Sequence, residues 1–151
     1  MKQQDYQCSI TADVTAEEAF EGISHVSAWW AKKLDGCTES LHDIFTVRFG
    51  DTHVTFEITE LVPEKKVVWH VTDCYLPFVE DKHEWTGTNI VWEISAAGDS
   101  TSAAGDSTRI SMTHRGLVPE VECFENCQKG WNRYIKESLF KYLTERVGLP
   151  A

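Results

Sequence analysis

The sequence predicts an α+β fold in which an antiparallel sheet of about six strands is covered by one long C-terminal helix. Five successive segments between residues 45 and 114 alternate apolar with polar side chains, as strands with one buried face do. A weaker alternation at Tyr6–Ala12 predicts an edge strand, and Pro119–Val147 repeats its apolar residues with the period of a helix. A sheet with one apolar face needs a cover, which this helix is expected to supply.

The predicted C-terminal helix presents an apolar stripe that is rich in aromatic residues. At about 3.6 residues per turn, the stripe contains Phe124, Cys127, Trp131, Ile135, Ser138 and Tyr142. Pro119 suits the first turn of a helix, and Gly148 followed by Pro150 marks its end. We expect Trp131, at the centre of the stripe, to be buried against the sheet and to anchor the fold.

Two short helices are expected between the first strand and the remaining strands. Thr15 and Glu18 have the spacing of a capping box, in which each side chain accepts a hydrogen bond from the other residue's backbone N–H. Ser24 can cap a second short helix that carries the pair Trp29–Trp30, and Gly36 is expected to end that helix. The predicted order is therefore strand, helix, helix, and then the main run of strands.

The main run of strands is predicted to fold as an antiparallel meander. Its inward-facing residues are expected to be Phe45, Val47 and Phe49, then Val54, Phe56 and Ile58, then Val67, Trp69 and Val71, then Ile90, Trp92 and Ile94, and finally Ile110, Met112 and His114. Tight turns are expected at Gly50–Asp51 and at Pro63–Lys66. The polar residues between the inward positions are expected to face solvent.

Two connections between the predicted strands are unusual. The first, Asp73–Trp85, is long and aromatic, which favours either a functional loop or a small apolar cluster on the rim of the sheet. The second contains a tandem duplication, because residues 95–101 are repeated unchanged as residues 102–108. Lengthening an exposed hairpin tip changes loop-closure entropy little. We therefore expect the duplication to have no role in function.

Length and composition limit the possible functions. At 151 residues, the chain is expected to form one domain spanning residues 1–151. Its formal net charge of −10 argues against nucleic acid and anionic membranes as partners, because basic surfaces bind phosphate groups. No apolar run approaches the roughly 18 residues of a membrane-spanning helix. The five cysteines are scattered and no signal-peptide pattern follows Met1, so a cytoplasmic location is expected.

The sequence contains no motif for catalysis or cofactor binding. A phosphate-binding glycine loop, a nucleophile elbow and a zinc-protease helix motif are all missing. Cys123 and Cys127 are one helical turn apart and could present two thiolates to a metal, but two small buried residues are the favoured interpretation. His114 either lines a cavity or, as we favour, hydrogen-bonds locally at its strand end. We expect no catalytic residue, no metal and no cofactor.

Six tryptophans are many for a domain of this size. Inward positions of successive strands and of the last helix should converge, although they are far apart in sequence. The residues expected to meet are Trp30, Phe56, Trp69, Trp92, Met112, His114, Trp131 and Ile135. They either line an apolar pocket or fill an aromatic core, and we weigh these two interpretations evenly. In a pocket, the rings would stack on a ligand and His114 would orient one polar group of it.

Several short segments together resemble a known family. They are the Trp29–Trp30 pair, Val54–Leu61 with Val67–Trp69, Glu84–Thr88, Thr113–Leu117, and Gly130–Trp131 with Leu139, Tyr142 and Leu143. With these segments the chain resembles the SRPBCC superfamily, whose helix-grip fold is shared with START lipid-transfer domains and the birch-pollen allergen. Within it, the chain is similar to the family of the activator of the heat-shock-protein-90 ATPase. The resemblance implies a curved antiparallel sheet that grips the long helix, with a cavity between them.

Three functions are consistent with the residues and the resemblance. The first is binding of a small apolar or aromatic molecule between helix and sheet, with Tyr75, Phe78 and Trp85 of the long connection as a lid. The second is a protein-interaction module, such as a chaperone accessory, that uses an exposed residue like Phe140 on the back of the last helix. The third is a cyclase- or hydrolase-like enzyme that uses His114, although the superfamily has no universal catalytic residues.

Overall fold

A computed structural model describes residues 6–31, 33–49, 51–76, 85–96, 108–117, 124–145 and 148. Within these residues the strands are β1 (Tyr6–Ala12), β2 (Lys33–Gly36), β3 (Ile44–Phe49), β4 (Thr52–Val62), β5 (Lys66–Tyr75), β6 (Asn89–Ala96) and β7 (Thr108–Arg115). The helices are α1 (Ala16–Ser24), α2 (Val26–Trp29), α3 (Phe124–Asn132) and α4 (Phe140–Glu145), and a π-helical segment, η1 (Arg133–Leu139), joins the last two.

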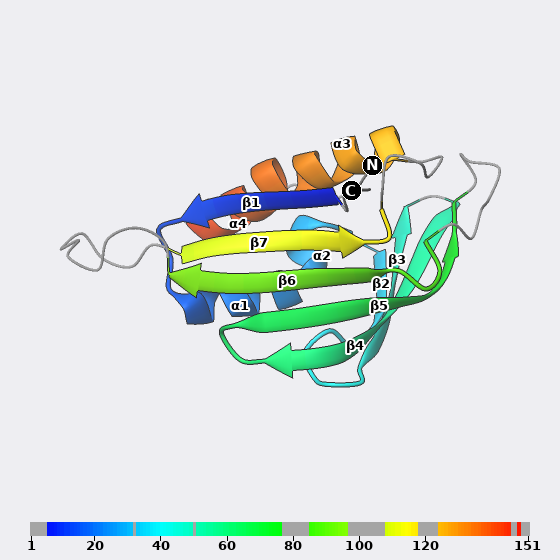
Figure 1. Ribbon diagram of the computed structural model, residues 1–151, viewed down its shortest axis with the longest axis horizontal. Helices are drawn as coiled ribbons and strands as arrows, with labels where there is room; N and C mark the ends of the chain where they lie inside the picture. The colour runs from blue at the N-terminus through cyan, green and yellow to red at the C-terminus, as the bar shows by residue number, and fades with distance from the viewer. Residues whose placement is uncertain are drawn as a thin grey trace, which may run out of the picture.

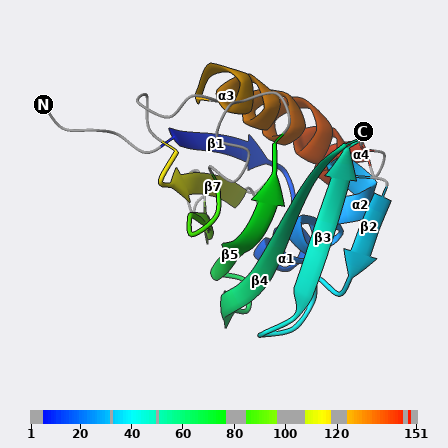
Figure 2. The ribbon, with the colours of Figure 1, turned by 90° about the vertical axis from the view of Figure 1, so that its right-hand side faces the viewer.

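All of the described strands form one antiparallel sheet. Their order is β1-β7-β6-β5-β4-β3-β2, which makes seven strands where the sequence predicts about six. The helices lie behind the sheet in Figure 1. Figure 2 shows that the sheet bends around α1 and α2 while the C-terminal helix runs along the side of β1. The predicted α+β helix-grip class is therefore confirmed.

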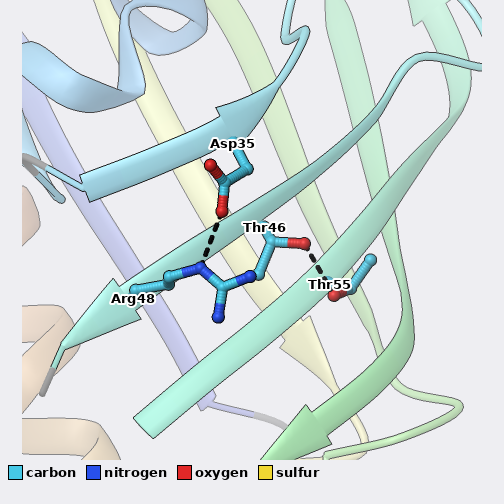
Figure 3. Close-up of polar contacts among 4 residues, drawn as sticks. All are labelled: Asp35, Thr46, Arg48 and Thr55. Carbon is cyan, nitrogen blue, oxygen red and sulfur yellow. Dashed lines mark hydrogen bonds and ion pairs between the residues drawn. The ribbon is translucent and has the colours of Figure 1, made fainter. Parts of the chain in front are cut away.

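The edge strand β2 corrects the expectation that Gly36 ends the second helix. That helix ends at Trp29, and β2 pairs antiparallel with β3. Gly36 has a φ of +97°, and a Cβ atom at this position would lie 2.2 Å from the Ile44 carbonyl oxygen, so only glycine fits. On the exposed side of the two strands, Arg48 Nε donates to Asp35 Oδ2 at 2.7 Å (Figure 3).

The middle of the sheet is bent by two irregularities in the pairing of β4 with β5. Thr46 and Thr55 face each other regularly across β3 and β4, with their hydroxyl oxygens 2.8 Å apart (Figure 3). The register between β4 and β5 then shifts at Thr55/Phe56 and again at Ile58/Glu60. Extra residues of this kind bend a strand and increase its twist. The bend turns β3 and β2 toward the helices, as Figure 2 shows.

The helix α1 begins at the predicted capping box. The Glu18 N–H donates to Thr15 Oγ1 and the Thr15 N–H donates to Glu18 Oε1, each at 3.0 Å. Near the other end of α1, Trp29 Nε1 donates to the Gly22 carbonyl at 3.1 Å. A Cβ atom on Gly22 would lie only 2.4 Å from Leu143 Cδ2. The first two helices and α4 are therefore packed together around this glycine.

The C-terminal helix continues from α3 through η1 to α4, and its middle is π-helical. The Phe140 N–H donates to the Ile135 carbonyl, five residues earlier rather than the four of an α-helix. Ser138 in this segment donates its hydroxyl to the Trp29 carbonyl, which ties the helix to the end of α2. Single π-helical turns inside α-helices occur frequently at functional sites.

The wider turn changes which residues of this helix face the core. Trp131 and Ile135 are buried, as the apolar stripe predicts. Farther along, Leu139 and Leu143 are buried, whereas Tyr142, which belongs to the predicted apolar stripe, is half-buried. Tyr142 thus packs against the core at the edge of the stripe, because a π-helical segment advances the chain by a smaller angle per residue.

The connections between the strands are only partly described. The turn at Pro63–Lys66 is confirmed, with the Lys65 N–H donating to the Val62 carbonyl at 3.0 Å. Several expectations lie outside the described residues or side chains, namely those for Gly50, Phe78, the repeat residues 97–107, Pro119, Cys123, Phe124 and Cys127.

Candidate functional site

The eight residues expected to meet all lie in the core between the sheet and the helices. They are Trp30 after α2, Phe56 of β4, Trp69 of β5, Trp92 of β6, Met112 and His114 of β7, Trp131 of α3 and Ile135 of η1. We call them the core cluster. None is more than 4% exposed, and all belong to one continuous apolar core. The structure therefore brings together residues from six elements and the end of a seventh.

Trp30 lies at the centre of the core cluster. Its ring centroid is 4.9 Å from that of Trp131, and it stacks on Trp69 at 6.2 Å with an angle of 2° between the ring planes. Phe56 and Phe49 lie 5.7 Å and 5.8 Å from the same ring. Such aromatic pairs contribute about 0.5–1.5 kcal/mol each beyond simple burial. In this conformation the rings fill the space between one another.

His114 is hydrogen-bonded on both sides of its ring. Trp131 Nε1 donates to His114 Nδ1 at 3.1 Å, so Nδ1 carries the lone pair. His114 Nε2 lies 2.9 Å from Thr88 Oγ1, and that hydroxyl donates its own hydrogen to the Trp85 carbonyl at 2.6 Å. Nε2 must then carry the hydrogen and donate to Thr88. The contacts thus assign the neutral Nε2–H tautomer.

The environment of His114 also opposes its protonation. The residue is fully buried, and burial lowers the pKa of the imidazole from 6.5 to about 3. A proton on Nδ1 would in addition point at the N–H of Trp131, which is a donor and cannot accept it. His114 is therefore an uncharged structural link at neutral pH. Its bonds extend farther than the local strand-end contact that we favour from the sequence, because one of them reaches the last helix.

The long connection contributes one of its three aromatic residues to this region. Trp85 is 7% exposed, stacks on Trp131 at 5.9 Å and 8°, and lies edge-on to His114 at 4.5 Å. Tyr75 belongs to β5 and stacks on His53 of β4 at 5.8 Å. Phe78 lies outside the described residues. The lid therefore stays a prediction.

Sequence reasoning missed Thr88 and Gly116 as residues of this site. Gly116 has a φ of +104°, and a Cβ atom there would lie 2.6 Å from Thr88 Cγ2. The glycine thus lets the end of β7 approach the residue that orients His114. Both belong to segments that carry the family resemblance, Glu84–Thr88 and Thr113–Leu117. Those two segments were the available signal, and the structure places them side by side.

Trp92 is a residue of the core cluster whose fully buried indole N–H makes no hydrogen bond to the described part of the chain. Among the residues that the structure describes, its buried Nε1 has no acceptor. The rings of Trp29 and Trp69 lie nearly perpendicular to it, at 5.7 Å and 5.4 Å. A buried indole N–H usually finds a partner, and an unmade bond costs about 1–3 kcal/mol. The site therefore contains an unused hydrogen-bond donor.

The ring contacts extend from the core cluster to the surface. Phe49 at the end of β3 contacts Trp30, and Tyr134 of η1 lies 6.0 Å from Phe49. Both Phe49 and Tyr134 are half-buried. Burial raises the pKa of the Tyr134 phenol, and the charge of Arg133 opposes that shift in part. The line of rings reaches solvent between the sheet and the π-helical segment.

The described residues contain no group of three or more histidine, cysteine or acidic side chains that could hold a metal. As far as the helices are described, none combines the length and the apolar character needed to cross a membrane.

Comparison with known proteins gives matches only among solved structures, because no protein-family model and no curated protein matches the chain. The Aha1 dimer of Colwellia psychrerythraea is 19% identical, with a TM-score of 0.71 over 95% of this chain and 96% of that one. An HSP90 activator from Plasmodium falciparum is 16% identical, with a TM-score of 0.60 over 88% and 91% of the two chains.

A further similar structure is DynU16, a protein of the dynemicin biosynthetic locus. It is 14% identical, with a TM-score of 0.66 over 94% of this chain but 48% of its own length. Similarity at such low identity establishes the fold and leaves the activity open. The chain therefore has the helix-grip fold, and its resemblance to the SRPBCC superfamily and to activators of the heat-shock-protein-90 ATPase is confirmed at the level of the fold.

Proposed function

We propose that the protein binds a small apolar or aromatic molecule that carries a hydrogen-bond acceptor, and that the core cluster is the binding site. The observation that carries this proposal is the buried Nε1 of Trp92, which lacks an acceptor among the described residues. An acceptor atom on a ligand would recover the roughly 1–3 kcal/mol of the unmade bond, or about 5- to 150-fold in affinity.

The proposed route into the core cluster passes between Phe49 and Tyr134. These two half-buried rings end the line of contacts that starts at Trp30. Because the core cluster is closed in this conformation, a ligand enters only if these rings and Trp30 change rotamer or the π-helical segment moves. The rival interpretation is a permanently filled aromatic core, which would show the same ring contacts but would not open.

A pair of probes that differ only in an acceptor atom tests the proposal. We would titrate the full chain with 2-acetylnaphthalene and with 2-ethylnaphthalene, and follow tryptophan fluorescence and the backbone amide signals in NMR spectra. We expect the ketone to bind at least fivefold more tightly, because its oxygen can accept from Trp92. We also expect amide shifts at β6, at β7 and in η1.

Variants connect this result to the cluster. Trp92→Phe keeps a ring but removes the N–H donor, and it should make the two probes bind equally. Tyr142→Phe removes a hydroxyl outside the core cluster and should leave the difference unchanged. If neither probe quenches fluorescence or shifts amides at millimolar concentration, the core is filled and the proposal is wrong. If both probes bind equally to the unaltered chain, Trp92 is satisfied by its neighbouring rings.

We infer a second candidate function, a protein-interaction module that acts as a chaperone accessory. Its support is the similarity of the fold to those of an Aha1 dimer and an HSP90 activator, together with apolar residues on the surface. Phe140 on the back of the last helix is 38% exposed, and Ile44 on β3 is 56% exposed. Exposed apolar side chains of this size are suited to protein contacts when they gather in a patch.

A direct binding experiment tests this second candidate. Purified heat-shock protein 90 would be titrated with the chain, and binding would be measured by calorimetry. Phe140→Ser and Ile44→Ser each remove one apolar contact without touching the core cluster, and one of them should weaken binding. An absence of any heat at micromolar concentration of both proteins would exclude the chaperone accessory role, whatever the naphthalene probes show.

We further propose that the protein works in the cytoplasm. Two of the described cysteines support this location, because Cys8 and Cys37 are free thiols, as expected in a reducing compartment.

A further inference from the structure

A hollow on the surface lies between the last turn of α1 and the loop that joins β2 to β3. It has a volume of about 370 Å³ and is lined by Phe20, Glu21, Ser24, His25 and Glu39. None of these residues belongs to the core cluster. The hollow is therefore separate from the core cluster, and an inference about it does not depend on the proposed function.

Hydrogen bonds fix the two walls of this hollow relative to each other. Thr38 donates its hydroxyl to the Ser24 carbonyl at 2.6 Å, which ties the loop to the end of α1. The Glu39 N–H donates to Asp43 Oδ2 at 3.2 Å and so closes the loop on itself. On the other wall, His25 Nδ1 lies 2.8 Å from the Tyr142 hydroxyl. The hollow is thus held open by contacts among three separate segments.

The lining of the hollow combines negative charge with an aromatic surface. Glu21 and Glu39 are exposed, and neither makes an ion pair with any residue in the described parts of the chain. Phe20 is half-buried and packs against the core. Two uncompensated carboxylates beside an apolar wall complement a molecule with a positive head and a short apolar body.

We propose that this hollow binds a small organic cation, namely a protonated amine attached to a short apolar group. Its volume falls at the lower end of the roughly 300–1,000 Å³ of small-molecule sites. The ammonium group lies between the carboxylates of Glu21 and Glu39, and the apolar body packs on Phe20. Exposed ion pairs each strengthen binding only about 1.4- to 5-fold, so binding is weak, in the millimolar range.

The test compares 2-phenylethylammonium with its uncharged analogue 2-phenylethanol. Both would be titrated into the full chain, and the backbone amide signals of residues 20–25 and 38–40 would be followed by NMR. The ammonium ion should shift these signals to saturation, and the alcohol should bind at least about threefold more weakly, because it lacks the charge. Equal binding of the two probes, or shifts confined to other segments, would overturn the proposal.

Charge-neutralising variants give the matched control. Glu21→Gln and Glu39→Gln should each weaken binding of the ammonium ion about two- to fivefold, and the double variant should weaken it more than either. Glu93→Gln changes the net charge equally but lies exposed on the sheet, outside the hollow. It should leave the affinity unchanged. If Glu93→Gln weakens binding as much as the other two, the cation responds only to the overall negative charge and no site exists.

Discussion

The indole N–H of Trp131 donates to Nδ1 of His114 at 3.1 Å, and this bond joins the C-terminal helix to β7. The two residues are 17 positions apart in the chain, and both are almost fully buried. Because His114 also donates to Thr88, the imidazole connects the last helix with the segment that carries Trp85. Two of the predictions below test this connection.

The first prediction concerns the pH dependence of stability. At pH 7 His114 is neutral in the folded and in the unfolded chain. Its pKa is about 3 when folded and has the ordinary value of 6.5 when unfolded, so between these values only the unfolded chain takes up a proton. The stability contributed by neutral His114 is complete above pH 6.5 and is lost as the pH falls toward 3. At ~1.4 kcal/mol per pH unit, the loss between pH 7 and pH 5 is about 2 kcal/mol.

This contribution is measured as a difference between variants, because carboxylates also titrate in the acidic range. Urea unfolding at pH 7 and pH 5 would be compared for the unaltered chain and for His114→Gln, whose amide can bond both Trp131 and Thr88 but does not titrate. His70→Gln, on the other face of the sheet, is the control. The prediction fails if the His114→Gln chain loses as much stability between the two pH values as the unaltered chain.

The second prediction concerns the two contributions of Trp131. Trp131→Ala removes a buried ring and should lower the free energy of unfolding by about 3–5 kcal/mol. Trp131→Phe keeps most of the ring but leaves His114 Nδ1 without its donor. This loss should lower the free energy of unfolding by about 1–3 kcal/mol. Phe140→Ala, at an exposed position of the same helix, should change the free energy of unfolding by no more than about 0.5 kcal/mol. A Trp131→Ala chain with the melting temperature of the unaltered protein would show that the helix is anchored elsewhere.

The third prediction tests the edge strand β2. Gly87 and Gly36 both have positive φ, but a Cβ atom on Gly87 would meet nothing within 4 Å, whereas one on Gly36 would meet the Ile44 carbonyl. Gly87→Ala should therefore lower the free energy of unfolding by the conformational term alone, about 1–2 kcal/mol. Gly36→Ala should lower it further, because β2 must separate from β3. Equal losses in urea unfolding would mean that β2 contributes no stability.

The fourth prediction concerns the duplicated segment. Any deletion of seven residues within the repeat gives the same sequence, which keeps Ala96 at the end of β6 and a threonine at the start of β7. That threonine matters, because Thr108 donates its hydroxyl to the buried Val14 carbonyl. The deletion should leave the melting temperature the same or slightly higher. A doubling of loop length changes the free-energy cost of closing the loop by only about 0.6 kcal/mol. Insoluble or unfolded protein would instead show that the second copy has a structural task.

The sequence by itself determined the features that depend on local pattern. Alternation of apolar and polar residues predicted six of the strands, and the capping box at Thr15 predicted the start of α1. The apolar stripe predicted the burial of Trp131. These features are readable because burial recurs with the period of the strand or the helix, and each period spans only a few neighbouring residues.

Only the tertiary structure decided which buried residues meet and how their polar atoms pair. The edge strand β2 has four residues, too few for a pattern, and it forms because β3 offers it hydrogen bonds. The π-helical turn arises inside a continuous helical pattern, and Leu143, which follows it, is buried in the core. The bonds of His114 and the unpaired N–H of Trp92 depend on contacts between distant segments. Such contacts leave no periodic trace in the chain, because they are set by the packing of whole elements against one another.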